Sequence, residues 1–307
     1  MTHKMALVGI GKIARDQHIP AINAHPDLHL AAVASRNATV EGVPSYPSLA
    51  ALLEAEPGID SVSLATPPMA RYDDARLALE AGHHVMLEKP PGATLSEVHD
   101  LERLAKARGV TLFATWHSRH AAAVAATRDW LADKTLREVR IDWKEDVRHW
   151  HPGQEWIWQA GGLGVFDPGI NALSVMTAIL PRAVFLKEAQ LSFPRNRDTP
   201  IAASLVFHDP DGASVTAAFD WLEQGDPKWN ISLVTEEGSA LLSEGGARLS
   251  IEGGDEVSGP DREYPGLYDR FAQLVRDGAS DVDLSPMRHV ADAFTMGRRL
   301  AAAPFEW

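Results

Sequence analysis

The chain has 307 residues, 45% of them hydrophobic and 23% charged, which is typical of a globular protein with room for two domains. Its formal net charge of −13 argues against nucleic-acid binding, because a phosphate backbone is bound by a basic surface. The absence of cysteine excludes disulfides, thiolate catalysis and cysteine-based zinc sites.

The N-terminal segment MTHKMALVGIGK is predicted not to be a signal peptide, since glycines interrupt its short apolar run. No stretch approaches the roughly 18 apolar residues that a membrane-spanning helix needs. We therefore expect a soluble, cytoplasmic protein that has no membrane partner.

The first 116 residues alternate between short apolar segments and amphipathic segments. The predicted strands are residues 5–10, 28–35, 59–66, 85–89 and 110–116. The predicted helices are residues 12–24, 48–55, 71–81 and 95–108. The last helix is preceded by the capping box Thr94-x-x-Glu97 and followed by Gly109. This alternation indicates βαβ units and a parallel sheet with helices on both faces.

After about residue 134 the pattern changes to long strand-like segments joined by short turns, which predicts an antiparallel sheet. The predicted strands are residues 137–147, 183–193, 201–208, 214–221, 229–235, 240–243 and 248–251. Helices are expected over residues 168–180, over residues 267–277 and after Ser285-Pro286.

Residues 9–14, GIGKIA, form a G-x-G-x-x-A motif at the first predicted strand–helix junction. Gly9 permits a tight turn, and Gly11 lets the backbone approach a pyrophosphate at the helix N-terminus. Its place in a βαβ series favours a dinucleotide site over a glycine turn without a ligand. The predicted fold class is therefore α/β. A Rossmann NAD(P)-binding domain is expected over residues 1–119, and an α+β domain with a large, mostly antiparallel sheet over 120–307.

The second predicted strand ends in Ala34-Ser35-Arg36-Asn37, without an acidic residue at its tip. An acid there would bind the adenosine ribose and favour NAD, whereas Ser35 and Arg36 can hold a 2′-phosphate. The cofactor is therefore predicted to be NADP or NAD, with NADP favoured. The alternative is that Arg36 is a solvated loop charge near the adenine.

Lys89 ends the fourth predicted strand and is followed at once by Pro90 and Pro91. Ligands of a parallel sheet bind beyond the carboxyl ends of its strands, where Thr66 and Pro67 also lie. An ammonium group there can bond to substrate hydroxyls or exchange protons. The alternatives are a surface lysine and an ion pair with Glu88, although adjacent strand residues point in opposite directions. The candidate cofactor-binding residues are Gly9, Gly11, Lys12, Ile13, Ser35, Arg36, Thr66, Pro67, Glu88 and Lys89.

In the segment VFDPGINALS, Asp167 precedes Pro168, and Asn171 follows four residues after Asp167. On a helix both side chains lie on one face. Asp-Pro is also an ordinary helix start, and composition alone favours a capping role for Asp167 on a helix that begins at Pro168.

Together, G-x-G-x-x-A, Glu88-Lys89-Pro90 and the D-P-G-I-N of residues 167–171 resemble the Gfo/Idh/MocA oxidoreductase family over essentially the whole chain. The segments LVGIGKIARDQHIPAI, LEKPPGATLSEV, TWHSR and FDPGINALS resemble its branch of bacterial D-galactose and L-arabinose 1-dehydrogenases. The family often has histidine where this chain has Asn171. Because an amide is no base, the proton must be handled by Asp167 or Lys89.

The resemblance implies oxidation of a free aldose at its anomeric carbon to the lactone. Lys89, Asp167 and Asn171 are then the catalytic candidates, with Asp167 as acid/base, Lys89 at the C1 oxygen and Asn171 orienting a ring hydroxyl. Sugar pockets combine polar groups with aromatic faces. The substrate-binding candidates are therefore His117, Glu145, Trp150, Trp158, Asp167, Asn171 and Trp229. Core packing is the alternative for each tryptophan, and no metal site is expected.

Two other functions stay open: a dehydrogenase of another polyol or sugar derivative, such as an inositol, and an NAD(P)-binding regulator without turnover. The regulator is disfavoured because it needs no proton-handling residues. A homodimer is also expected, because an antiparallel sheet with helices on one face has a second face to cover.

Overall fold

The structure is a computed structural model that describes residues 2–307 and divides them into two compact units. The first unit comprises the chain up to His117 together with Glu263–Leu284, and the second comprises Ser118–Arg262 and Ser285–Trp307. This division differs from the predicted ranges 1–119 and 120–307, because residues 263–284 return to the first unit. That return depends on packing between distant segments, which periodicity does not report.

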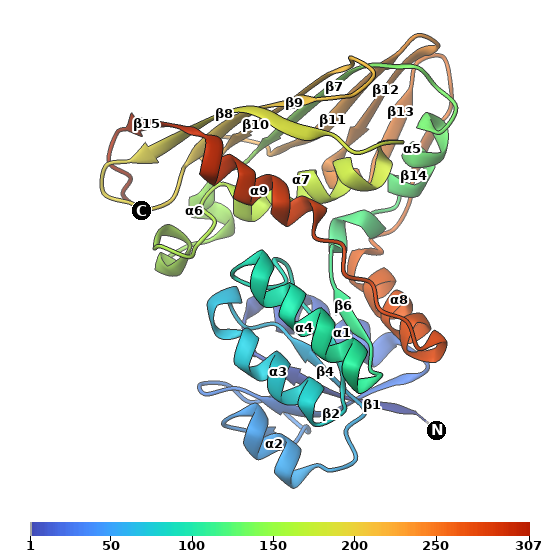
Figure 1. Ribbon diagram of the computed structural model, residues 1–307, viewed down its shortest axis with the longest axis vertical. Helices are drawn as coiled ribbons and strands as arrows, with labels where there is room; N and C mark the ends of the chain where they lie inside the picture. The colour runs from blue at the N-terminus through green and yellow to red at the C-terminus, as the bar shows by residue number, and fades with distance from the viewer. Residues whose placement is uncertain (1) are drawn as a thin grey trace. The chain divides into compact units, whose positions relative to one another are not determined.

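The first unit contains a six-stranded sheet of order β3-β2-β1-β4-β5-β6, in which every pair is parallel (Figure 1). Its strands are β1 His3–Val8, β2 Leu28–Ala34, β3 Ser45–Tyr46, β4 Ser61–Leu64, β5 His84–Leu87 and β6 Leu112–Ala114. This is the strand order of a Rossmann fold, which confirms the predicted fold class. Only β3 was not predicted, since two residues carry no periodicity.

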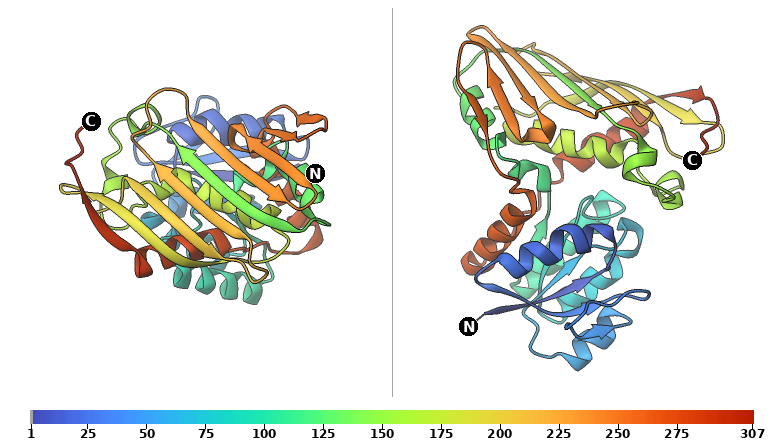
Figure 2. Two further views of the ribbon diagram at one scale, coloured as in Figure 1. Left: turned by 90° about the horizontal axis from the view of Figure 1, so that it is seen from above. Right: turned by 180° about the vertical axis from the view of Figure 1, so that it is seen from behind.

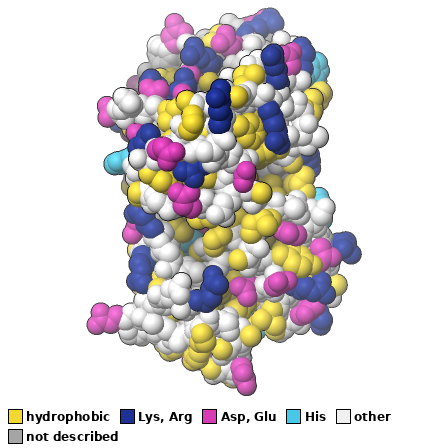
Figure 3. All heavy atoms as spheres, turned by 90° about the vertical axis from the view of Figure 1, so that its left-hand side faces the viewer, with side chains coloured by type: hydrophobic (Ala, Val, Ile, Leu, Met, Phe, Trp, Pro, Cys, Tyr) yellow, Lys and Arg dark blue, Asp and Glu magenta, His cyan; other side chains and the backbone are white. Residues whose placement is uncertain are grey.

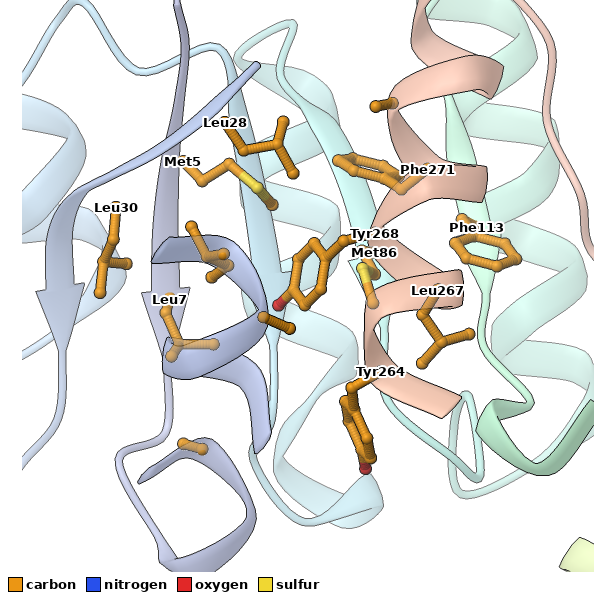
Figure 4. Packing of buried hydrophobic residues seen from close by; sticks show 14 of the residues in the cluster. Met5, Leu7, Leu28, Leu30, Met86, Phe113, Tyr264, Leu267, Tyr268 and Phe271 are labelled. Atoms are coloured by element: carbon orange, nitrogen blue, oxygen red, sulfur yellow. The ribbon is translucent and has the colours of Figure 1, made fainter. Parts of the chain in front are cut away.

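Helices cover both faces of this sheet. They are η1 Ala14–His18, α1 Ile19–Ala24, α2 Leu49–Ala55, η2 Pro68–Ala70, α3 Tyr72–Glu80, α4 Leu95–Arg108 and α8 Glu263–Asp277. One core includes Leu52 of α2, Ala78 of α3 and Leu101 of α4. The other joins α1 to α8, whose Tyr268 and Phe271 lie against the sheet (Figure 4). Because α8 completes this second core, it belongs to the first unit.

Helix α4 has the ends that its sequence predicts. The Thr94 side chain accepts a hydrogen bond from the Glu97 amide at 3.2 Å. The Glu97 carboxylate accepts one from the Ala93 amide at 3.0 Å, and Gly109 ends the helix with a φ of 66°. Local hydrogen bonds therefore define both ends, which is why the sequence is sufficient to place them.

The helix after the glycine loop starts with a π-helical segment, η1, and continues as α1. The Ile19 amide bonds to the Ala14 carbonyl, five residues back. Pro20 has no amide hydrogen, and in an α-helix its ring would collide with the Asp16 carbonyl. A widened turn ahead of the proline relieves this collision. It also sets the direction of His18, which is fully buried.

The second unit contains a nine-stranded sheet of order β14-β13-β12-β11-β7-β10-β9-β8-β15, whose strands lie side by side in Figure 2. Its strands are β7 Leu136–Lys144, β8 Phe185–Pro194, β9 Ala202–His208, β10 Ser214–Asp220, β11 Lys228–Thr235, β12 Gly238–Ser243, β13 Arg248–Ile251, β14 Glu256–Ser258 and β15 Arg298–Ala302. The pairs β7–β10 and β8–β15 are parallel and the rest antiparallel, so the predicted mostly antiparallel sheet is confirmed.

The helices of the second unit are α5 Val124–Leu131, α6 Val147–Trp150, η4 Glu155–Trp158, α7 Phe166–Ile179, η5 Glu244–Gly246 and α9 Ser285–Met296, and the short η3 His117–His120 spans the boundary. Helices α7 and α9 pack on one face of the sheet (Figure 1). Along each strand, buried residues alternate with more exposed ones. One register row that faces these helices is buried throughout: Leu205, Ala217, Ile141, Ile231, Leu242 and Leu249.

As far as the structure describes the second unit, it has no helix on the opposite face of the sheet (Figure 2). The adjacent register row on that face is Glu188, Val206, Thr216, Arg140, Ser232, Leu241 and Ser250. None of these residues is buried. On the side of the molecule shown in Figure 3, acidic and basic side chains are interspersed, so the net charge is not gathered in one patch there.

Candidate active site

The two glycines of the loop after β1 have different surroundings. Gly9 has a φ of +89°, and a Cβ on it would lie 2.8 Å from the amide nitrogen of Thr66. A Cβ on Gly11 would meet no protein atom within 4 Å. Gly9 is therefore required by the protein itself, whereas Gly11 leaves open space beside the helix N-terminus. Such space suits a pyrophosphate, so this loop fits a dinucleotide.

Thr66 follows β4 at the same edge of the sheet as Gly9. Its Oγ1 atom is buried and has no hydrogen-bond partner among the described residues. A buried hydroxyl without a partner is uncommon, and a ligand that approaches this edge would satisfy it. The next residue, Pro67, is exposed. Thr66 is thus the second feature of the first unit that fits a bound dinucleotide.

The other candidate cofactor residues lie at the positions expected of them. Ser35 and Arg36 follow β2, and Arg36 is exposed. The Ser35 amide bonds to the Tyr46 carbonyl of β3 at 2.9 Å, which fixes the backbone there. Lys12 is exposed and pairs with Asp16, and Ile13 is 39% exposed. None of these four side chains is buried in the core.

Glu88, at the tip of β5, is only 5% exposed, and its carboxylate is surrounded by donors. One oxygen accepts from the Lys89 amide at 2.8 Å. The other lies 3.0 Å from His18 Nε2 and 3.3 Å from the Tyr264 hydroxyl. Burial raises the pKa of Glu88, but the hydrogen bond and charge of His18, with the charges of His117 and Lys89, lower it to about 2. Glu88 is therefore an ionised anchor inside the unit.

Arg71 lies between the ends of β4 and β5 and is 2% exposed. Its guanidinium donates to three main-chain carbonyls, those of Thr66, Glu88 and Pro90. Burial lowers the pKa of Arg71 to about 10, and the charge of Glu88 opposes that shift. Arg71 thus stays charged at neutral pH and ties together the two loops that carry Thr66 and Lys89.

His117 ends the first unit, and its Nδ1 lies 3.2 Å from the Glu263 carboxylate. The ring stacks on Tyr264 at a centroid distance of 5.3 Å. Burial lowers the pKa of His117, but the hydrogen bond and charge of Glu263 and the charge of Glu88 raise it above its usual value. His117 therefore carries a proton more readily than an ordinary histidine.

In the second unit, Glu145 follows β7 and is 5% exposed. Its two oxygens lie 2.9 Å from the indole Nε1 of Trp229 and 3.4 Å from that of Trp221. His151 Nε2 lies 4.0 Å from the Glu145 carboxylate and 3.5 Å from the Asp167 carboxylate. An imidazole thus stands between two buried carboxylates, each of which was proposed as a site residue.

The predicted capping role of Asp167 is wrong. Helix α7 begins at Phe166, and its N-cap is Val165, so Asp167 lies inside the first turn. The Asp167 amide bonds to the Gly164 carbonyl at 2.8 Å. Its carboxylate does not cap the helix and lies 3.5 Å from His151 Nε2. Asn171 lies one turn later on the same helix and is half-buried.

The tryptophans of this unit differ in their surroundings. Trp150 is 41% exposed, and its ring centroid lies 5.2 Å from that of Trp229. Trp158 is 2% exposed and contacts the rings of Trp221 and Phe305. The packing alternative accounts for Trp158, whereas Trp150 and Trp229 form a partly exposed aromatic pair beside Glu145.

The structure therefore brings together Glu145, Trp150, Trp229 and Asp167 through His151 in the second unit. In the first unit it brings together the glycine loop, Thr66, Glu88 and His117. The sequence-based site candidates did not include His18, Arg71, His151, Tyr264 or Tyr268. The only signal of His18 is its place four residues after Ala14 on the buried helix face.

Within residues 2–307, no group of three or more histidine or acidic side chains is placed to hold a metal ion. None of the helices described there is long and apolar enough to cross a membrane.

A parallel sheet with Rossmann order and a glycine loop at its first strand–helix turn defines a nicotinamide-dinucleotide-binding protein. The buried carboxylates and imidazoles at the sheet edge and in the second unit are groups that can handle the proton of a hydride transfer. The class is therefore that of a dinucleotide-dependent oxidoreductase.

Comparison with known proteins gives the family. Residues 3–116 match the model of the Gfo/Idh/MocA oxidoreductase family, described as an NAD-binding Rossmann fold. Galactose 1-dehydrogenase of Pseudomonas fluorescens is 46% identical over 314 residues, which cover 98% of each chain. The chain belongs to the Gfo/Idh/MocA family, as predicted, and is an oxidoreductase.

Comparison with solved structures gives the same family. The crystal structure of D-galactose-1-dehydrogenase from Rhizobium etli has a TM-score of 0.96 at 57% identity, and the match covers 99% of this chain and 98% of that one. A 3-ketoreductase from Actinomadura kijaniata, in complex with NADP and TDP-benzene, has a TM-score of 0.84 at 20% identity, over 98% of this chain and 100% of that one. The second likeness shows the fold alone.

Proposed function

We propose that this chain is an NAD(P)-dependent aldose 1-dehydrogenase, which oxidises the anomeric carbon of D-galactose, L-arabinose or both to the lactone. The observation that carries the proposal is similarity to two galactose 1-dehydrogenases, at 46% and 57% identity, along almost the whole chain. The buried polar groups described above agree with it, because a neutral sugar needs hydrogen-bonding groups and an aromatic face.

We assign sugar recognition to the second unit. The Glu145 carboxylate is oriented by Trp229 and Trp221, and a carboxylate has about four lone-pair positions in all. An oriented carboxylate can therefore accept hydrogen bonds from sugar hydroxyls without reorganising. Trp150 and Trp229 offer an aromatic surface for the C–H face of the ring. Asn171 is assigned to one ring hydroxyl.

For the chemical step, we assign Asp167 as the base that takes the proton of the anomeric hydroxyl. His151, at 3.5 Å, keeps a donor beside the Asp167 carboxylate. Lys89 is assigned to the C1 oxygen, where its ammonium stabilises the negative charge that develops. The nicotinamide ring, when bound, accepts the hydride from C1. The glycine loop and Thr66 would hold the dinucleotide, and Ser35 with Arg36 would hold the 2′-phosphate of NADP.

The test is a panel of initial rates with D-galactose, L-arabinose, D-glucose and myo-inositol, each with NAD and with NADP. We expect turnover of galactose or arabinose, with a higher kcat/KM for NADP. Lys89→Ala and Asp167→Asn are each expected to lower kcat by roughly 10²-fold or more, while the Kd of the dinucleotide changes little.

Tight dinucleotide binding without turnover of any of the four sugars would contradict the proposal. It would favour a regulator or a larger, charged substrate. A higher kcat/KM with NAD would contradict the roles assigned to Ser35 and Arg36 and leave the reaction itself in place.

We also propose that the chain forms a homodimer through the helix-free face of the nine-stranded sheet. Val206, Val234 and Leu241 on that face are 37%, 40% and 38% exposed, so the face presents aliphatic side chains that a second copy of the chain would cover. Light scattering of the purified protein is expected to give the mass of two chains, and Val206→Glu to shift it toward one. Leu77→Glu, at an exposed position of α3, is the control. An unchanged dimer in Val206→Glu would contradict this interface.

A further inference from the structure

We propose that a buried network of His18, Tyr264 and Tyr268 around the Glu88 carboxylate positions Lys89, and that His18 is therefore a positioning residue of the reaction. The inference rests on the proposed function of Lys89. None of the three residues is among the catalytic, cofactor-binding or substrate-binding candidates, and the network involves only the first unit.

The network surrounds the buried carboxylate of Glu88. A carboxylate out of water is costly unless it is well bonded, and a buried ion pair is a weak source of stability. Glu88 nevertheless has donors on both oxygens, from Lys89, His18 and Tyr264. What such an arrangement supplies is fixed geometry, since each bond is satisfied in one orientation of the carboxylate only.

The geometry that it fixes is the backbone of Lys89. The Lys89 amide donates to Glu88 Oε1 at 2.8 Å. On either side of Lys89, the carbonyls of Glu88 and Pro90 accept from the buried guanidinium of Arg71. The Glu88–Lys89 peptide group is thus held by two charged side chains, and Arg71 also holds the Pro90–Pro91 peptide group. The backbone on both sides of Lys89 is therefore fixed.

Hydrogen bonds connect the polar groups of the whole network. The ionised Glu88 can only accept, so His18 donates to it through Nε2 and Tyr264 through its hydroxyl. His18 Nδ1 lies 2.7 Å from the Tyr268 hydroxyl, which in turn lies 3.4 Å from the Ser63 hydroxyl. Every described polar atom in the network has a partner, which is typical of a group held for orientation.

Three distant parts of the chain build the network. The π-helical segment before Pro20 carries His18, the tip of β5 carries Glu88, and α8 carries Tyr264 and Tyr268 one turn apart. Figure 4 shows both tyrosines on the side of α8 that faces the sheet and the helix after the glycine loop. A displacement of the helix after the glycine loop would therefore be transmitted to Lys89 through the contact of His18 with Glu88.

Removing His18 should leave Glu88 Oε2 with Tyr264 as its main donor. The charged groups that act on Glu88 are His18 from η1, His117 from η3, the adjacent Lys89 and Arg71 before α3. Loss of His18 removes a hydrogen bond and a charge that favour the ionised Glu88, so the pKa of Glu88 should rise. The acidic limb of the pH–rate profile should then move to higher pH. A protonated carboxyl also holds the Lys89 amide less firmly.

The experiment compares His18→Leu, which removes the donor, with His18→Gln, whose amide can donate from a similar distance. His18→Leu is expected to lower kcat at least tenfold, with KM values within about threefold, and to move the acidic limb upward. His18→Gln should recover most of kcat. Tyr264→Phe should have a smaller effect in the same direction. Tyr72→Phe, which removes a hydrogen bond to Asp100 elsewhere in this unit, is the matched control and should behave as the parent.

A second readout does not depend on turnover. Pro90 and Pro91 have no amide hydrogen, so the Lys89 amide is an isolated probe whose hydrogen exchange can be followed by NMR. We expect exchange at Lys89 to be at least tenfold faster in His18→Leu and unchanged in Tyr72→Phe. If His18→Leu does not fold, the kinetics and the hydrogen exchange at Lys89 are both measured in Tyr264→Phe instead.

The outcomes separate the two proposals. Folded variants with the parent's kcat, pH profile and Lys89 exchange would overturn the positioning role and leave the proposed function intact. Faster Lys89 exchange in a protein that turns over none of the sugars would uphold the network and refute the proposed function. A fall in kcat in both His18→Leu and His18→Gln, without faster exchange at Lys89, would also overturn the inference.

Discussion

At the scale of single residues, Gly9 and Gly11 are glycines for different reasons. Gly9 has a left-handed φ, and its neighbour Thr66 leaves no room for a Cβ. Gly11 has open space around it in the protein. The sequence motif assigns Gly9 to a tight turn and Gly11 to the approach of a pyrophosphate. The structure adds that the contact with Thr66 requires Gly9 whether or not a ligand is bound.

We therefore expect Gly9→Ala to lower both the thermal midpoint and dinucleotide affinity, since strain at such a position costs about 1–3 kcal/mol. Gly11→Ala should leave the midpoint close to that of the parent and weaken dinucleotide binding at least tenfold, because its methyl group occupies the space of the pyrophosphate. Calorimetry and fluorescence titration measure the two effects. Equal loss of stability in both variants would contradict this distinction.

At the scale of elements, α7 lies close against the sheet of the second unit because Gly169 has no side chain. A Cβ there would lie 2.8 Å from Cδ2 of Phe219 on β10. Gly169 belongs to the same turn as Asp167 and Asn171, so the distance between helix and sheet also sets where these two side chains lie. Packing thus connects the core of the second unit to its candidate catalytic groups.

Gly169→Ala is expected to destabilise the protein by about 1–3 kcal/mol through overpacking. It should also lower kcat, because α7 carries Asp167. The double variant Gly169→Ala/Phe219→Leu shortens the opposing side chain and should restore part of the stability and part of kcat. A double-mutant cycle measures the coupling between the two positions. Additive effects, with no recovery in the double variant, would show that this contact does not set the position of α7.

At the scale of the whole molecule, stability should depend on the ionised state of Glu88. Its folded pKa of about 2 lies below its ordinary value of 4.5, so its contribution is complete above pH 4.5 and is lost as the pH falls toward 2. The difference between the two values corresponds to roughly 3 kcal/mol in the free energy of unfolding.

Urea denaturation at several pH values from 7 down to 3 measures this dependence. The parent is expected to lose stability on acidification more steeply than Glu88→Gln, whose side chain does not titrate. The difference between the two curves isolates Glu88 from other carboxylates with a lowered pKa, such as Asp100 and Glu155. Parallel curves would mean that folding does not lower the pKa of Glu88, which would contradict this prediction.

The sequence predicts those parts of this molecule that depend on neighbours along the chain. The capping box of α4, the alternation of β9 and β10 and the glycine loop after β1 each depend on residues within a few positions of one another. The same local spacing was misleading at Asp167, where Asp-Pro resembles a helix cap. There the preceding turn starts the helix one residue earlier than the aspartate.

By itself, then, the sequence determined the two kinds of sheet, most of their strands, the dinucleotide loop and the family, because periodicity, caps and short motifs are local. Only the tertiary structure decided that α8 returns to the first unit, that Glu88 pairs with His18, and that His151 stands between Glu145 and Asp167. Glu88 is separated by 70 residues from His18 and by 176 from Tyr264. Such partners are chosen by the packing of whole elements, which no short stretch of sequence encodes.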